Sequence, residues 1–199
     1  MKSYRMWVGA VIAVAALVLI LSQGTSGGGG LAAAPPEQAV KKPSVAIGSA
    51  FYDEGELKAA LIAHLKKRGY EVKDFTAGNP AKKLDYPQVA HLVAAEVSKG
   101  NFDRAILICG TGMGVSIVAN KHAKVYAAVV DSVYAAKYSR IYNNSNILCL
   151  GQFITAPVMA TEILDVWLNT KAFDHPKWGP YNRDIALPQI GEIEKEVFK

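Results

Sequence analysis

Between Ser44 and Asn169 the chain alternates five times between a short apolar run and a segment with helical spacing of its apolar residues. The apolar runs are largely continuous, which is typical of parallel strands buried on both faces. Strict alternation of strand and helix requires right-handed crossovers and predicts an α/β fold with a doubly wound sheet. We expect strands at 44–48, 71–75, 105–109, 126–130 and 146–150, and helices at 56–67, 87–99, 113–121, 133–142 and 156–169.

Length and composition favour one globular domain. The 199 residues are 51% hydrophobic and 20% charged, which excludes a disordered chain. Lys and Arg exceed Asp and Glu by 22 to 17, and by 20 to 17 without residues 1–24, so the surplus is too small to predict a nucleic-acid partner. Cys109 and Cys149 lie inside predicted strands, and we expect free thiols rather than a disulfide.

The N-terminal segment has the layout of an export signal. Lys2 and Arg5 precede sixteen apolar residues, Met6 to Leu21. A membrane span usually needs about 20 apolar residues, and small residues follow this run, so we predict a cleaved signal peptide at 1–24, with an uncleaved membrane anchor as the alternative.

A glycine-rich stretch then predicts a flexible linker at 25–42, followed by the folded domain at 43–199. The expected location is therefore periplasmic, extracellular or membrane-anchored, with a domain facing the cytoplasm as a further alternative. The mass of the mature N-terminus after cell fractionation distinguishes these locations.

The most informative loop is Cys109–Gly114, which follows the third predicted strand and opens a helix. Its glycines, at 110, 112 and 114, allow a sharp turn and expose backbone amides suited to an anion or an oxyanion. The spacing matches neither the dinucleotide fingerprint nor the phosphate loop. A cysteine beside a helix N-terminus is a candidate base or nucleophile, and the alternative is a buried structural thiol.

The run from Ile106 to Ile117, continued by Ala119-Asn120-Lys121, resembles the signature of the ribose-5-phosphate isomerase B and galactose-6-phosphate isomerase family. The resemblance extends from residue 43 to about 198 and includes 46–49, 56–58, 69–75, 85–87 and 146–151. It implies a Rossmann-like three-layer α/β/α sandwich with a five-stranded parallel sheet. It also implies a homodimer or tetramer with a shared active site, and aldose–ketose isomerisation of a phosphosugar such as ribose 5-phosphate, without metal or cofactor.

The resemblance also implies roles for individual residues. Cys109 takes the place of the base that forms a cis-enediolate, and Thr111 that of a residue near the sugar ring oxygen. Asn143 matches an asparagine that holds substrate hydroxyls, with a helix C-cap as the alternative. The remaining expected substrate contacts in the loop are Gly110, Gly112, Met113 and Gly114.

The chain departs from the family at three places. An Asp-His pair normally follows the first strand directly, whereas this chain has Ala50-Phe51-Tyr52-Asp53 there, with about one extra residue. The pair is therefore missing from its place, and Asp53 is either a substitute from a shifted position or a surface acid. The histidine that assists ring opening is replaced by Tyr142, whose phenol is the poorer proton carrier at neutral pH. An expected arginine is replaced by Phe153. A substrate that is open-chain or shorter than a pentose would need less of what is missing.

Phosphate still requires cations. Because the family draws arginines from the C-terminal segment of the partner protomer, Arg183 is the first candidate, with Arg140 and Lys137 in reserve. A non-catalytic sugar or anion binding protein of the same fold remains the alternative function.

Overall fold

The computed structural model describes residues 44–50, 56–77 and 84–198, all of which belong to one compact unit, Val40–Lys199. The expected signal peptide at 1–24, the linker at 25–42 and Asp53 lie outside the described residues. Within the described ranges, no helix combines the length and apolar character needed to cross a membrane.

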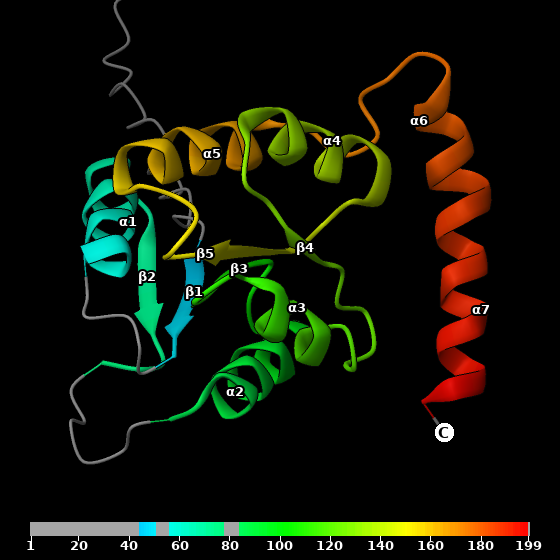
Figure 1. Ribbon diagram of the computed structural model, residues 1–199. Helices are drawn as coiled ribbons and strands as arrows, with labels where there is room; N and C mark the ends of the chain where they lie inside the picture. Colours follow the sequence, from blue (N-terminus) through cyan, green and yellow to red (C-terminus); the bar gives the residue numbers. More distant parts are fainter. Residues whose placement is uncertain (1–43, 51–55, 78–83, 199) are drawn as a thin grey trace, which may run out of the picture. The chain divides into compact units, whose positions relative to one another are not determined.

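The sheet has five strands, paired in parallel throughout, in the order β2-β1-β3-β5-β4 (Figure 1). This arrangement confirms the predicted parallel sheet. The strands are β1 (Ser44–Ser49), β2 (Glu71–Asp74), β3 (Arg104–Cys109), β4 (Ala127–Val129) and β5 (Ile147–Gly151).

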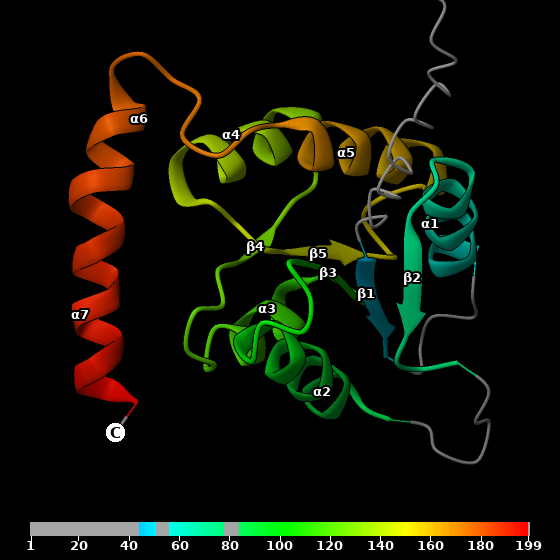
Figure 2. The same ribbon diagram turned by 180° about the vertical axis from the view of Figure 1, so that it is seen from behind.

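Helices cover both faces of the sheet, so the three-layer α/β/α sandwich is confirmed (Figures 1 and 2). Two separate clusters of buried apolar side chains lie on the two faces. One face is covered by α1 (Glu56–Lys67), α4 (Val133–Asn143) and α5 (Pro157–Asn169), and the other by α2 (Tyr86–Ser98) and α3 (Met113–Ala119).

Local signals in the sequence explain where the helices begin and end. Gly69 follows α1 with a φ of +84°, a conformation that glycine adopts without steric cost. Asp85 and Gln88 form a reciprocal capping box at the start of α2. The residue that caps α4 is Asn144, in the left-handed region, rather than Asn143, which is the last helical residue.

The expectation of burial on both faces holds for three strands and is wrong for two. The described residues of β3 and β5 are buried almost throughout, as are those of β1. In β2 exposed residues alternate with half-buried ones, and β4 has two half-buried residues followed by an exposed one. Both are edge strands, where a neighbouring strand is present on one side only.

The C-terminal segment is helical, which the sequence analysis did not predict. It comprises α6 (Trp178–Tyr181), a π-helical turn η1 (Asn182–Ala186) and α7 (Leu187–Val197). No residue of α7 is buried, and its Glu194 accepts a hydrogen bond from the Lys124 amide at 3.1 Å.

Candidate active site

Cys109 is the last residue of the central strand β3 and lies at the C-terminal ends of the strands. Its side chain is 7% exposed and borders a cavity of about 450 Å³. The cavity is lined by Tyr86, Cys109, Gly110, Thr111, Gly114 and Phe153. The thiol therefore faces a space that a small substrate can enter.

The loop after β3 directs hydrogen-bond donors at polar atoms beside this cavity. The amide of Gly112 donates to Cys109 Sγ at 3.1 Å, and an N–H aimed at sulfur stabilises negative charge on it. The amide of Met113 donates to Thr111 Oγ1 at 3.3 Å, which leaves the hydroxyl proton of the exposed Thr111 available to a ligand.

The loop fits into this place only because its glycines lack side chains. Gly112 has a φ of +77°, and a Cβ there would lie 3.1 Å from the carbonyl carbon of Leu150. A Cβ on Gly110 would lie 2.8 Å from the Phe153 ring, and one on Gly114 would lie 2.8 Å from the Tyr86 ring. The glycines thus let the loop backbone approach β5 and the two aromatic rings that border the cavity.

The second cysteine has a different environment. Cys149 is completely buried in β5, and burial raises the pKa of its thiol, with a further contribution from nearby Cys109. A thiol held neutral in the core has a packing role. Of the two cysteines, Cys109 is the one placed for chemistry.

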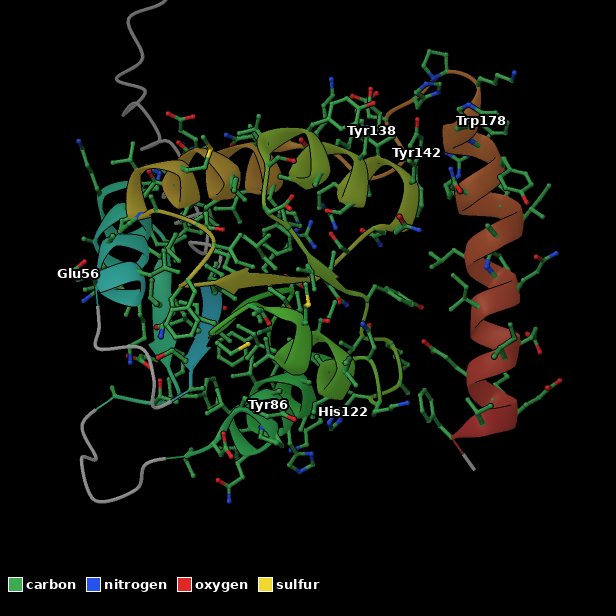
Figure 3. All side chains as sticks on the ribbon, viewed as in Figure 1. Glu56, Tyr86, His122, Tyr138, Tyr142 and Trp178 are labelled. Atoms are coloured by element: carbon green, nitrogen blue, oxygen red, sulfur yellow. The ribbon has the colours of Figure 1, made fainter. Side chains whose placement is uncertain are left out.

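The other candidates from the sequence are spread over the fold. Met113 is 55% exposed at the start of α3. Tyr142 and Asn143 end α4, on the opposite face of the sheet from Tyr86 (Figure 3). Arg183, in η1, pairs with Asp184 at 2.7 Å, and this contact raises the pKa of Arg183. In the described part of the chain, none of these four lines the cavity beside Cys109.

Two residues that line the cavity were not predicted as site residues. Phe153 stands where the family resemblance implies an arginine, and Tyr86 lies in the matching segment 85–87. Their contacts with the loop depend on two glycines whose crowded surroundings appear only in three dimensions. Glycines at alternate positions of a loop indicate that other groups lie close to the loop backbone, but they do not indicate which groups these are.

Comparison with known proteins identifies the family. Residues 45–177 match the family described as Ribose/Galactose Isomerase. The chain belongs to this family. Relatives of the chain are named as sugar-phosphate isomerases, and the chain is accordingly an aldose–ketose isomerase.

Individual relatives cover most of the folded part. The 4-deoxy-4-sulfo-D-erythrose isomerase of Clostridium sp. (strain MSTE9) is 37% identical over 144 residues, which are 72% of this chain and 91% of the relative. The D-erythrulose-4-phosphate isomerase of Pectobacterium atrosepticum is 36% identical over 130 residues, 64% of this chain and 84% of the relative. The structure of Clostridium thermocellum ribose-5-phosphate isomerase B matches with a TM-score of 0.68 and 41% identity, covering 77% of this chain and 98% of that one.

Proposed function

We propose that this chain interconverts an aldose and a ketose that carry a terminal anionic group, with Cys109 as the catalytic base. The observation that supports this most directly is the Cys109 sulfur, which borders the cavity and accepts the Gly112 amide hydrogen. The family match supports the reaction type.

The proposed reaction moves two protons and needs no external oxidant. The Cys109 thiolate removes the proton from C2 of the aldose, a C1=C2 double bond forms, and the carbonyl electrons move to O1. Loop amides stabilise the resulting enediolate. The proton on O2 transfers to O1, Cys109 returns its proton to C1, and the C2 carbonyl forms.

The substrate we favour has four carbons and an anion on C4. Two relatives are named for such sugars, 4-deoxy-4-sulfo-D-erythrose and D-erythrulose 4-phosphate. A C4 atom that carries the anionic group has no free hydroxyl with which to close a five-membered ring. Such a substrate requires no ring opening, which fits a chain that carries Tyr142 where the family resemblance implies a histidine.

A panel of sugar phosphates tests this function. We expect the full-length chain to convert erythrose 4-phosphate with a kcat/KM about 10²-fold above that for ribose 5-phosphate, because general acid catalysis of ring opening contributes about that much. Carbonyl migration is followed by NMR, and binding by calorimetry. Binding heat without turnover on every sugar would contradict the isomerase and indicate a binding protein.

We further propose that a second copy of the chain completes the site. Four large apolar side chains are exposed around the loop: Met113, Ile117, Phe153 and Ile154. Such a patch is expected where another protein surface packs. The described residues that line the cavity include no Lys or Arg, yet an anionic substrate needs a cation. Arg183 of the second copy is the candidate.

Mixing two inactive variants tests this arrangement. Cys109→Ala and Arg183→Gln should each be impaired as homodimers. In a dimer of one of each, one site keeps both Cys109 and Arg183, so co-refolding equal amounts should restore roughly one quarter of wild-type activity. The Lys195→Gln variant, which alters another exposed tail cation, serves as control and should stay active. No recovery in the mixture would contradict the shared site.

A further inference from the structure

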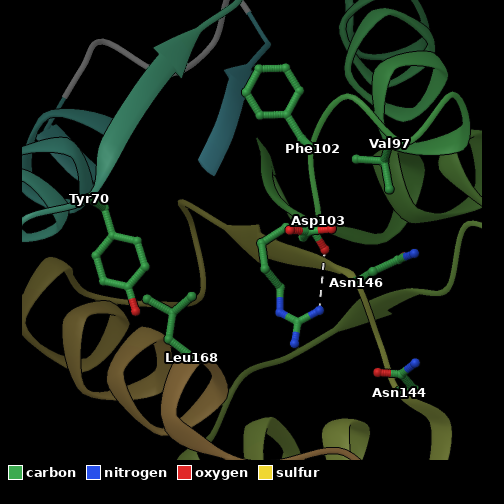
Figure 4. A pocket seen from close by; sticks show the side chains of 9 residues that line it. Tyr70, Val97, Phe102, Asp103, Asn144, Asn146 and Leu168 are labelled. Carbon is green, nitrogen blue, oxygen red and sulfur yellow. Dashed lines mark hydrogen bonds between the residues drawn. The ribbon is translucent and has the colours of Figure 1, made fainter. Parts of the chain in front are cut away.

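A second cavity lies at the N-terminal ends of the strands (Figure 4). Its volume is about 540 Å³. Its residues come from the ends of helices and from the segments that lead into β2, β3 and β5: Tyr70, Val97, Gly100, Phe102, Asp103, Arg104, Asn144, Asn146 and Leu168.

This cavity is separate from the candidate active site. Arg104 is the first residue of β3 and Cys109 is the last. Five steps along a strand span about 17 Å. The two cavities share no lining residue and lie at opposite ends of the strands.

The Arg104 side chain in this cavity has a positive charge without a close ion-pair partner in the described part of the chain, although the charge of the neighbouring Asp103 partly offsets the lowering of its pKa by burial. Its Nη1 donates to the backbone carbonyl of Asp103 at 3.2 Å (Figure 4). Its guanidinium carbon lies 5.3 Å from the centre of the Trp167 ring. Within the described ranges, Arg104 forms no ion pair, and the rest of its N–H groups have no hydrogen-bond partner.

A second guanidinium increases this surplus of positive charge. Arg140 is 3% exposed and donates to Asn144 Oδ1 at 2.8 Å and to the Ser145 carbonyl at 2.5 Å. Its guanidinium carbon lies 6.0 Å from the same Trp167 ring. Burial, and then the charge of Arg104, lowers the pKa of Arg140 to about 10.

These contacts leave two neighbouring cations in a half-buried place where all described hydrogen-bond acceptors are neutral. A half-buried cation such as Arg104 is less well hydrated than one in open water, and an anion in the cavity would offset that loss. The exposed Asp103 carboxylate at the rim makes no ion pair with Arg104.

We propose that this cavity binds a small organic anion, a carboxylate or a phosphate monoester. Its charged group pairs with the free N–H groups of Arg104, which match the planar geometry of such anions. Its apolar body lies against Tyr70, Phe102 and Leu168, which line the same cavity. The site is additional to the one at Cys109 and does not depend on the proposed isomerase function.

Fluorine NMR of the full-length chain tests the proposal, with 5-fluorotryptophan at the three Trp positions and the signals assigned by Trp7→Phe and Trp178→Phe. Phenyl phosphate and benzoate are the probes. We expect at least one of them to shift the Trp167 signal saturably. The probe that binds more tightly shows whether the site prefers a phosphate or a carboxylate. Inorganic phosphate should bind at least tenfold more weakly, because it lacks the apolar body.

Variants then assign the binding to Arg104. Arg104→Gln should weaken the probe at least tenfold, whereas Arg104→Lys should retain measurable binding, which shows that the fold tolerates substitution there. Asp103→Asn should tighten binding a few-fold by removing a negative charge. Cys109→Ala should leave the Trp167 shift unchanged. The absence of a saturable shift with both probes, or unchanged affinity in Arg104→Gln, would overturn the proposal.

Discussion

Replacing Cys109 by Ala should lower kcat/KM for the best sugar substrate about 10³-fold, because the base that removes the C2 proton is lost. The remaining loop amides and binding contacts would still act on the substrate, so we expect residual activity above the uncatalysed reaction. The most direct measurement is exchange of the substrate C2 hydrogen with solvent deuterium, since this reports proton abstraction alone.

Cys149→Ala is the matched control for this experiment. It removes the same thiol group from a fully buried position in β5, away from the cavity lining. We expect a loss of stability of about 1 kcal/mol and nearly normal exchange. Normal exchange in Cys109→Ala would remove this cysteine from the mechanism and leave the fold assignment intact.

Gly112→Ala should reduce kcat about 10²-fold and destabilise the fold by about 3 kcal/mol. Alanine at a φ of +77° costs roughly 1–2 kcal/mol, and the new Cβ would also press on the backbone of Leu150 and Cys149. The loop would have to move away from β5. That movement would separate the Gly112 amide from Cys109 Sγ. Steady-state kinetics and urea unfolding measure the two effects.

Gly69→Ala distinguishes crowding from backbone strain. Gly69 has a φ of +84°, similar to that of Gly112, but no atom lies within 4 Å of the position of its missing Cβ. We expect a stability loss of about 1 kcal/mol and unchanged kcat. If Gly112→Ala and Gly69→Ala lost the same stability and the same kcat, the close approach of the loop to β5 would not contribute to the geometry of the site.

Much of the fold could be predicted because its signals are local. Leu57, Leu61 and Leu65 recur at helical spacing and are all buried, and the predicted bounds of α1 agree with the structure. The sequence analysis did not predict α7, although Ile190, Ile193 and Val197 recur at helical spacing and its proline lies in the first turn, where proline favours a helix start. Its helical character is not supported by an apolar face packed on the sheet.

The two cavities likewise combine features that the sequence shows with features that appear only in the fold. Cys109 and its glycines are contiguous, so their pattern was visible in the sequence. The aromatic rings of Tyr86 and Phe153 reach the cavity from α2 and from the turn after β5, and sequence spacing does not report such approaches. The cavity around Arg104 combines short pieces from several elements, and no motif marks it.

The different environments of the two cysteines also have a practical use. An alkylating reagent such as iodoacetamide meets open space beside Cys109, whereas Cys149 is enclosed by the core. In the folded protein, labelling should therefore stop at one equivalent per chain. The label count then gives the concentration of intact reactive centres in any preparation, and adding substrate should slow the labelling.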